Sequence, residues 1–120
     1  MAQPAPVTST RYPYLPVRVT IRGRQFRGEA PLDTGFTGHL AIPPGILGSG
    51  IGLPDARIDW QLADGSIIGA AIFYGTVEIV GLLPVPAAIT VLGDECILGR
   101  GVIDRFRVTF DHGSQVIAEI

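Results

Sequence analysis

Apolar and polar residues alternate in the first third of the chain, and this predicts two consecutive strands. Val17, Val19 and Ile21 alternate with polar residues, which is the period of a half-buried strand. A turn signal at residues 22–23 separates this segment from a second alternating one, which runs directly into Asp33. The sequence therefore predicts that Asp33 lies at the end of a buried strand.

The rest of the chain predicts six more strands and one short helix. The predicted strands are residues 39–42, 58–62, 67–80, 85–92, 107–111 and 115–120. Asp64-Gly65 separates two of them and indicates a tight hairpin, because Gly accepts the positive φ that such a turn needs. Val102, Ile103 and Phe106 have helical spacing. The fold class predicted from these patterns is all-β with one short C-terminal helix.

Length and composition are those of one globular domain. The chain has 120 residues, of which 47% are hydrophobic, so it can bury a core. Residues 1–14 are rich in proline and are expected to form a flexible N-terminal arm before a domain over residues 15–120. No secretory signal is evident, and no run approaches the about 18 apolar residues of a membrane span. We therefore expect a cytoplasmic protein with no membrane partner.

Charge and cysteine content exclude several classes of function. The net charge is −2, and 17% of residues are charged, so no overall field favours nucleic acid. The single cysteine, Cys96, excludes an intrachain disulfide and a cysteine-rich metal site. We expect Cys96 to be a small, partly buried core residue rather than a nucleophile. No metal and no cofactor are expected.

Four arginines are concentrated in the two predicted N-terminal strands. They are Arg18, Arg22, Arg24 and Arg27. A site for a polyanion would usually have aromatic residues between the basic ones, and few are present here. Glu29 also follows the group. We therefore expect these four arginines to form a solvated strand face.

The run Asp33-Thr34-Gly35 is the main candidate for chemistry. A carboxylate at the end of a strand, in a Gly-rich turn, can be exposed to solvent while the strand fixes its position. The backbone can approach the carboxylate at Gly35, and the N–H group there can donate to it. An Asp that caps the N–H groups of a turn would give the same tripeptide. From these three residues alone, both interpretations remain open.

Three features in order resemble the retropepsin-like aspartic proteases, which include the retroviral enzymes and bacterial relatives. They are Asp33-Thr34-Gly35, the hairpin around Ala63-Asp64-Gly65-Ser66, and Ile97-Leu98-Gly99-Arg100 followed by a short helix at 101–106. The resemblance covers roughly residues 15 to 120. It implies a closed β-barrel of the retropepsin type.

The resemblance also implies a role for each matching residue. Asp33 would be the catalytic carboxylate, and Thr34 and Gly35 would support its loop. Ala63, Asp64, Gly65 and Ser66 would form a flap over the site, and Ile97, Leu98, Gly99 and Arg100 would be structural neighbours. The retroviral enzymes often have an acidic residue soon after the Gly, able to pair with the Arg. Here Thr37 and Gly38 stand in that place, so Arg100 needs another partner or has none.

The chemistry of this family explains why one such Asp in a short chain implies a homodimer. Hydrolysis needs one ionised and one protonated carboxylate close together, so a second chain must supply the second Asp33. The function predicted is an aspartic endopeptidase acting on extended peptide or protein substrates. One alternative is a retropepsin-fold dimer that binds extended peptides without efficient cleavage. Another is an unrelated small β-barrel binding module in which Asp-Thr-Gly occurs by chance.

Overall fold

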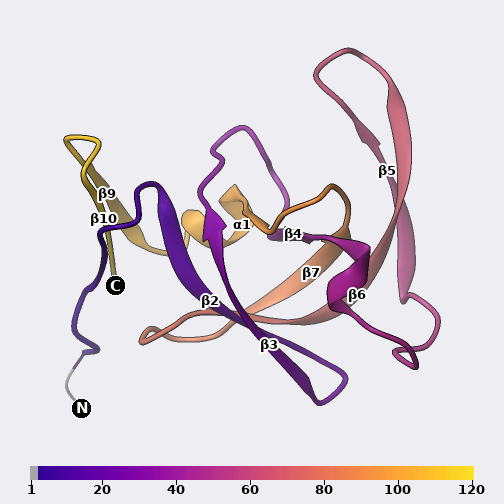
Figure 1. Ribbon diagram of the computed structural model, residues 1–120, viewed down its shortest axis with the longest axis horizontal. Coiled ribbons are helices and arrows are strands. Elements are labelled where there is room, and N and C mark those ends of the chain that lie inside the picture. Colours follow the sequence, from indigo (N-terminus) through magenta and orange to yellow (C-terminus); the bar gives the residue numbers. More distant parts are fainter. Residues whose placement is uncertain (1–2) are drawn as a thin grey trace.

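A computed structural model describes residues 3–120 and shows a mainly β protein (Figure 1). The strands are β1 (Val7–Ser9), β2 (Tyr14–Ile21), β3 (Arg24–Pro31), β4 (Leu40–Ile42), β5 (Ala56–Gln61), β6 (Ile67–Ile79), β7 (Val85–Val91), β8 (Ile97–Leu98), β9 (Arg107–Asp111) and β10 (Gln115–Glu119). The helical elements are a 3₁₀ turn, η1 (Pro44–Ile46), and α1 (Arg100–Ile103). The predicted all-β class is therefore confirmed.

The strands form two sheets. The larger sheet has the order β3-β2-β6-β7-β4-β8, and β5 pairs with β6 beside this path. Its neighbours are antiparallel except for the parallel pair β4 and β7. The smaller sheet has the order β1-β10-β9 and lies to one side of the larger one (Figure 1). The predicted hairpin at residues 64–65 is present, as β5 with β6, and the predicted strands at 107–111 and 115–120 pair with each other as β9 and β10.

The predicted closed barrel is not confirmed. Within residues 3–120 the two edges of the larger sheet, β3 and β8, meet only at one isolated bridge, between Leu32 and Leu98. The chain enters a turn at Asp33, so the strand cannot continue its pairing with β8. The sheet edges touch where Asp33 begins, and they do not form a continuous ladder there.

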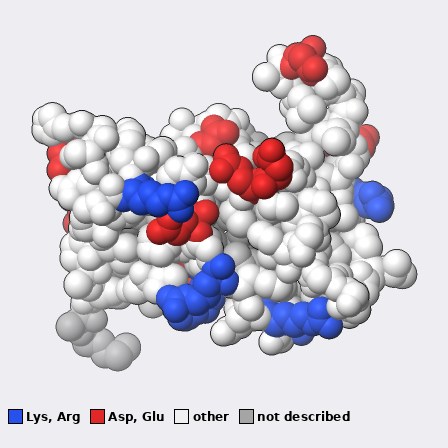
Figure 2. All heavy atoms as spheres, in the orientation of Figure 1, with Lys and Arg blue, Asp and Glu red and all other residues white. Residues whose placement is uncertain are grey.

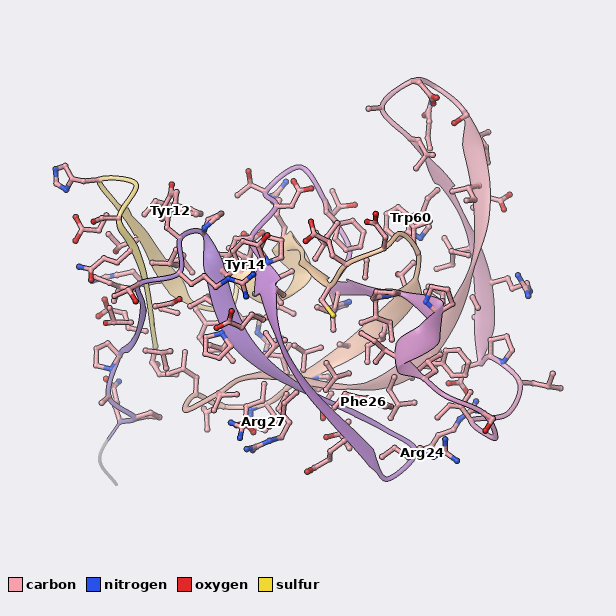
Figure 3. The ribbon with its side chains drawn as sticks, viewed as in Figure 1. Tyr12, Tyr14, Arg24, Phe26, Arg27 and Trp60 are labelled. Atoms are coloured by element: carbon pink, nitrogen blue, oxygen red, sulfur yellow. The ribbon has the colours of Figure 1, made fainter. Side chains whose placement is uncertain are left out.

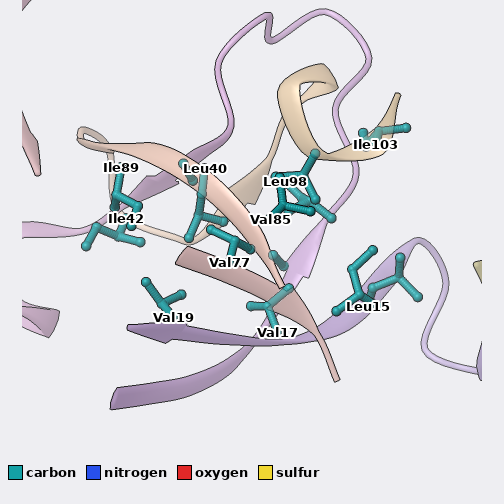
Figure 4. Close-up of a cluster of buried hydrophobic side chains, with 14 of the residues drawn as sticks. Leu15, Val17, Val19, Leu40, Ile42, Val77, Val85, Ile89, Leu98 and Ile103 are labelled. Carbon is teal, nitrogen blue, oxygen red and sulfur yellow. The ribbon is translucent and has the colours of Figure 1, made fainter. Parts of the chain in front are cut away.

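The core lies between the curved strands of the larger sheet and α1 (Figure 4). In β2 the apolar residues of the alternating pattern, Leu15, Val17, Val19 and Ile21, are all buried, and the polar positions between them are not. Burial of each such side chain stabilises the fold by about 1.5–3 kcal/mol. This core fixes the ends of the strands, and Asp33 lies at one of those ends.

The N-terminal segment is more regular than its sequence predicts. Val7–Ser9, within the predicted flexible arm, forms β1 and pairs with β10, while residues 1–2 of that arm lie outside the described part. The side chains of Val116 and Ala118 in β10 are fully buried. A strand of three residues directly after a proline has too short an alternation to be predicted. Tyr14, also assigned to the arm, opens β2.

The helix is shorter than predicted. It comprises Arg100–Ile103 instead of residues 101–106, and the chain then continues in turns whose N–H groups bond to carbonyls three residues back. Val102 and Ile103 are buried as the helical spacing predicts. None of the helices in residues 3–120 has the length and apolarity needed to cross a membrane.

Candidate functional site

Asp33 lies where the two edges of the larger sheet, β3 and β8, meet. Its N–H group donates to the carbonyl oxygen of Leu98 (2.9 Å), directly after the bridge between Leu32 and Leu98. Its own carbonyl oxygen accepts from the N–H group of Phe36 (3.2 Å), which closes the turn. The backbone of Asp33 is thus fixed from both sides, while the residue is exposed to solvent.

The Asp33 carboxylate accepts a hydrogen bond from the backbone of its own loop. The N–H group of Gly35 donates to Oδ1 at 2.8 Å. A Cβ atom at position 35 would lie 3.1 Å from the same oxygen, so a side chain there would crowd the carboxylate. The turn-capping interpretation is therefore correct for Oδ1, but the exposed carboxylate remains available for chemistry. Thr34 is exposed beside it.

The second predicted element, around Gly99, packs against the loop that follows Asp33. Three backbone hydrogen bonds run from the N–H groups of one segment to the carbonyls of the other: Gly99 to His39 (2.9 Å), Arg100 to Phe36 (2.8 Å) and Gly101 to Gly38 (3.0 Å). Together with the bond from Asp33 to Leu98, they lock the two segments together. The structure thus brings together two of the three sequence features.

Gly99 is required by close contact rather than by its backbone conformation. A Cβ atom at this position would lie 2.2 Å from the carbonyl oxygen of Gly38 and 2.6 Å from Cδ2 of Phe36. Real Cβ atoms do not approach backbone so closely, so any side chain would push the loop after Asp33 away. This explains physically why a Gly follows Ile97 and Leu98.

Asp33 opens onto an apolar cleft of about 500 Å³. The cleft is lined by residues of the Asp33 loop, β4, the β5–β6 hairpin and the β7–β8 connection. Among its lining residues within the described chain, Asp33 is the only one with an ionisable side chain. Figure 2 shows mainly acidic side chains along the edge from which the hairpin rises. Any acid–base chemistry inside this cleft therefore depends on Asp33.

The β5–β6 hairpin projects from the body of the molecule (Figure 1). At its tip Gly65 has φ +87°, as predicted, and Leu62 and Ser66 are joined by a backbone hydrogen bond of 2.8 Å. The hydroxyl and N–H groups of Ser66 donate to Asp64 and lower the pKa of that carboxyl. Only Ala63 of the four predicted flap residues lines the cleft. Asp64, Gly65 and Ser66 lie beyond it.

Trp60 is a cleft residue that sequence reasoning did not identify. It comes from β5, lines the cleft and packs against Phe36 of the Asp33 loop, with ring centroids 5.2 Å apart and planes tilted by 55°. Its Nε1 atom is buried and has no hydrogen-bond partner within residues 3–120. Figure 3 shows Trp60 on the side of the projecting hairpin that faces the rest of the molecule. The only available signal was its position in an alternating segment directly before the predicted turn.

Arg100 pairs with the residue that directly follows its own helix. It pairs with Asp104 at 3.4 Å, one helical turn further on, and both side chains are about half exposed. Such a pair contributes only about 0.3–0.5 kcal/mol. Arg100 is thus paired with Asp104 instead of with an acidic residue after Gly35, and this pair adds little to stability.

Other candidate chemistries receive no support from the geometry. No group of three or more His, Cys, Asp or Glu side chains that could hold a metal ion occurs in residues 3–120. Cys96 is partly buried against the core, as predicted, and burial raises the pKa of its thiol above the ordinary value. A protonated thiol is a poor nucleophile.

Comparisons with known proteins were informative at the level of structure. No family model matches the sequence, and no curated protein sequence matches it. The fold is similar to that of a retropepsin-like aspartic protease from Rickettsia conorii, with a TM-score of 0.61 and 17% identity over 95% of this chain and 90% of that one.

Two viral structures are also similar. The solution structure of a simian foamy virus (mac) protease has a TM-score of 0.53 and 18% identity over 76% of this chain and 91% of that one. A foamy viral protease-reverse transcriptase, solved with an RNA/DNA hybrid, has a TM-score of 0.53 and 19% identity over 79% of this chain but only 12% of that longer one. At these identities the likeness shows the fold, which is retropepsin-like.

Proposed function

We propose that this chain, which has a retropepsin-like fold, is one subunit of a homodimeric aspartic endopeptidase. The observation that carries the proposal is the place of Asp33. Its backbone is held by hydrogen bonds on both sides and its carboxylate is exposed. In the part of the chain that the structure describes, it is the only ionisable group among the residues that line the cleft.

One carboxylate is not sufficient for the reaction. An ionised carboxylate takes a proton from water while the water oxygen bonds to the carbonyl carbon, and a protonated carboxyl gives its proton to the carbonyl oxygen. The C–N bond then breaks as the amine leaves with a proton. Two adjacent carboxyls can share one proton for this purpose, because both cannot ionise cheaply at short distance.

The second carboxyl is supplied, in this proposal, by a second copy of the chain. Within the described residues the cleft lining contains no other acid and no histidine. A two-fold axis close to the Asp33 loops would bring two Asp33 side chains together and make one site from two subunits. Thr34 and Gly35 would support the paired loops. The four residues 63–66 at the tip of the β5–β6 hairpin would act as a flap over an extended peptide.

The first experiment measures cleavage of unfolded casein by the purified protein between pH 4 and 7. We expect activity that disappears in Asp33→Asn and persists in the presence of chelators and thiol reagents. A protein that binds casein but does not cleave it would favour the alternative function, a peptide-binding dimer. Loss of activity with a chelator alone would contradict the two-carboxyl mechanism.

The second experiment tests the shared site. At fixed wild-type concentration, an equal amount of Asp33→Asn chain is added, and subunit exchange is verified by mass spectrometry of differently tagged chains. Random pairing leaves about a quarter of the dimers with two aspartates, so the rate should fall to about half. An unchanged rate after complete exchange would mean that each subunit has its own complete site.

A further inference from the structure

The β2–β3 turn reaches across to the segment that precedes β5. Arg22, in this turn, donates from Nη1 to the carbonyl oxygen of Ile51 (2.7 Å) and from Nη2 to Oδ1 of Asp55 (3.0 Å). Two different acceptors on one guanidinium fix its orientation. The arginines predicted to form a solvated strand face therefore include one that binds another part of the chain.

Asp55 in turn binds the base of the β5–β6 hairpin. Its N–H group donates to the carbonyl oxygen of Ile72 (2.9 Å), and its Oδ2 accepts from the N–H group of Tyr74 (2.9 Å). Because Asp55 directly precedes β5, its carboxylate joins three elements: the β2–β3 turn, the start of β5 and the middle of β6. Both carboxylate oxygens are used.

Neighbouring residues reinforce this contact. The Arg22 guanidinium lies 5.0 Å from the centre of the buried Phe73 ring. A Cβ atom at Gly52 would lie 3.1 Å from Nη1 of Arg22, so the segment before β5 passes close to the guanidinium. Arg24, at the lower end of the β2–β3 hairpin in Figure 3, donates to the carbonyl oxygen of Ser49 (3.0 Å).

The outer part of the hairpin has few other attachments. Within residues 3–120, β5 pairs only with β6, and the side chain of Ile67 beyond it is 69% exposed. The packing of Trp60 on Phe36 is one contact between the hairpin and the Asp33 loop. The direction in which the hairpin leaves the body is therefore set largely at its base, where Asp55 lies.

We propose that Arg22 and Asp55 are positioning residues, whose ion pair anchors the base of the β5–β6 hairpin and so sets the place of the hairpin over the cleft. The inference rests on the proposed function, in which this hairpin covers the substrate. Both side chains are about one-third exposed. A pair of this kind contributes little to global stability, so its loss should affect the hairpin rather than the fold.

The chain offers a matched control. Arg18 and Glu78 form another partly exposed ion pair, at 3.2 Å, which joins β2 to β6 in the part of β6 that belongs to the body of the sheet. The test variants are Arg22→Gln and Asp55→Asn, and the control variants are Arg18→Gln and Glu78→Gln. Each keeps the approximate shape of the side chain and removes its charge.

The first measurement is amide hydrogen exchange of residues 56–70, with the full chain in the Asp33→Asn background. The second is the affinity for fluorescein-labelled unfolded casein in the same background, measured by anisotropy. Loss of the ion pair should speed hairpin exchange and weaken casein binding by about two- to fivefold each, as expected for a partly exposed pair. The control variants should change neither quantity by as much.

Hairpin exchange that is unchanged in Arg22→Gln and Asp55→Asn, or changed equally in the controls, would overturn the anchor. Faster exchange without weaker casein binding would overturn its role in placing the hairpin over substrate. Both measurements use protein that cannot turn over, so they decide this inference even if the wild type does not cleave casein. A failure of the proposed protease function is recognised separately, in the cleavage assay.

Discussion

The two sides of the cleft are built in different ways. The loop that begins at Asp33 is held by backbone hydrogen bonds to the carbonyl oxygen of Leu98 and from the N–H groups of Gly99 and the start of α1, and Gly99 allows the segments to touch. The β5–β6 hairpin opposite is a two-stranded ribbon whose outer end is exposed. Strand β6 belongs to both regions, since Ile79 at one end is fully buried and Ile67 at the other is 69% exposed.

Under the proposed function, this difference would give the site a fixed half and an adjustable half. A carboxylate that must meet another one at short distance needs a rigid loop, because a small displacement would separate the reacting groups. A cover over a peptide chain must move to admit it, and such elements come from the less stable parts of a fold. The predictions below test how sharply the two halves differ.

The largest contrast is expected along β6 itself. Ile79→Ala should lower the free energy of unfolding by about 2–5 kcal/mol, because it leaves a cavity in the core. Ile67→Ala should change it by less than about 0.5 kcal/mol, because that side chain is mostly in water. Urea denaturation followed by far-UV circular dichroism measures both. A similar loss for both variants would show that the hairpin is part of the core.

An intermediate effect is expected where the two halves touch. Trp60→Phe keeps an aromatic ring against Phe36 but loses part of the apolar contact. It also removes the buried Nε1–H group, which has no partner within residues 3–120 and whose burial costs about 1–3 kcal/mol. The two changes offset each other, so stability should change by less than about 1 kcal/mol. Trp60→Ala, which removes the ring contact as well, is expected to cost roughly 2 kcal/mol. Equal losses for both variants would mean that the indole N–H has a partner.

The smallest effect concerns acid. The N–H group of Tyr74, and then the Arg22 side chain, lower the pKa of Asp55 below its ordinary value of 3.8. A carboxyl whose pKa is lower in the folded than in the unfolded state stabilises the folded state at pH values above its ordinary pKa. This contribution to stability is lost as the pH falls below that ordinary pKa. The anchor of the hairpin should therefore stay charged at mildly acidic pH. Thermal unfolding should show a shallower loss of stability below pH 4 in Asp55→Asn than in the wild type, and parallel curves would contradict this.

Local patterns predicted much of the fold and of the fixed half of the site. Alternation located β2, β3 and β6 to within a few residues, and Asp64-Gly65 predicted the hairpin turn with its positive φ. The position of Asp33 at the end of a strand followed from the same pattern. These features depend on neighbours in sequence, where periodicity and turn chemistry are decisive.

Features that depend on distant residues were not predictable in this way. The parallel pairing of β4 with β7, the single bridge that replaces a closed ladder, and the pairing of β1 with β10 all join remote segments. The Arg22 side chain could be assigned to a solvated face because its partner, Asp55, is 33 positions away. Trp60 was missed for the same reason, since nothing in the sequence shows that it meets Phe36.

The pairing of β1 with β10 has a consequence for the order of folding. Val7 is paired with Ala118, more than 100 positions further along the chain, and β10 is the central strand of its sheet. Contacts between such distant segments form late, because closing a long loop costs conformational entropy before the contacts can stabilise the fold. The larger sheet can therefore form while Val7–Ser9 is still unpaired. We therefore expect the addition of β1 to the smaller sheet to be the last step in the folding of this chain.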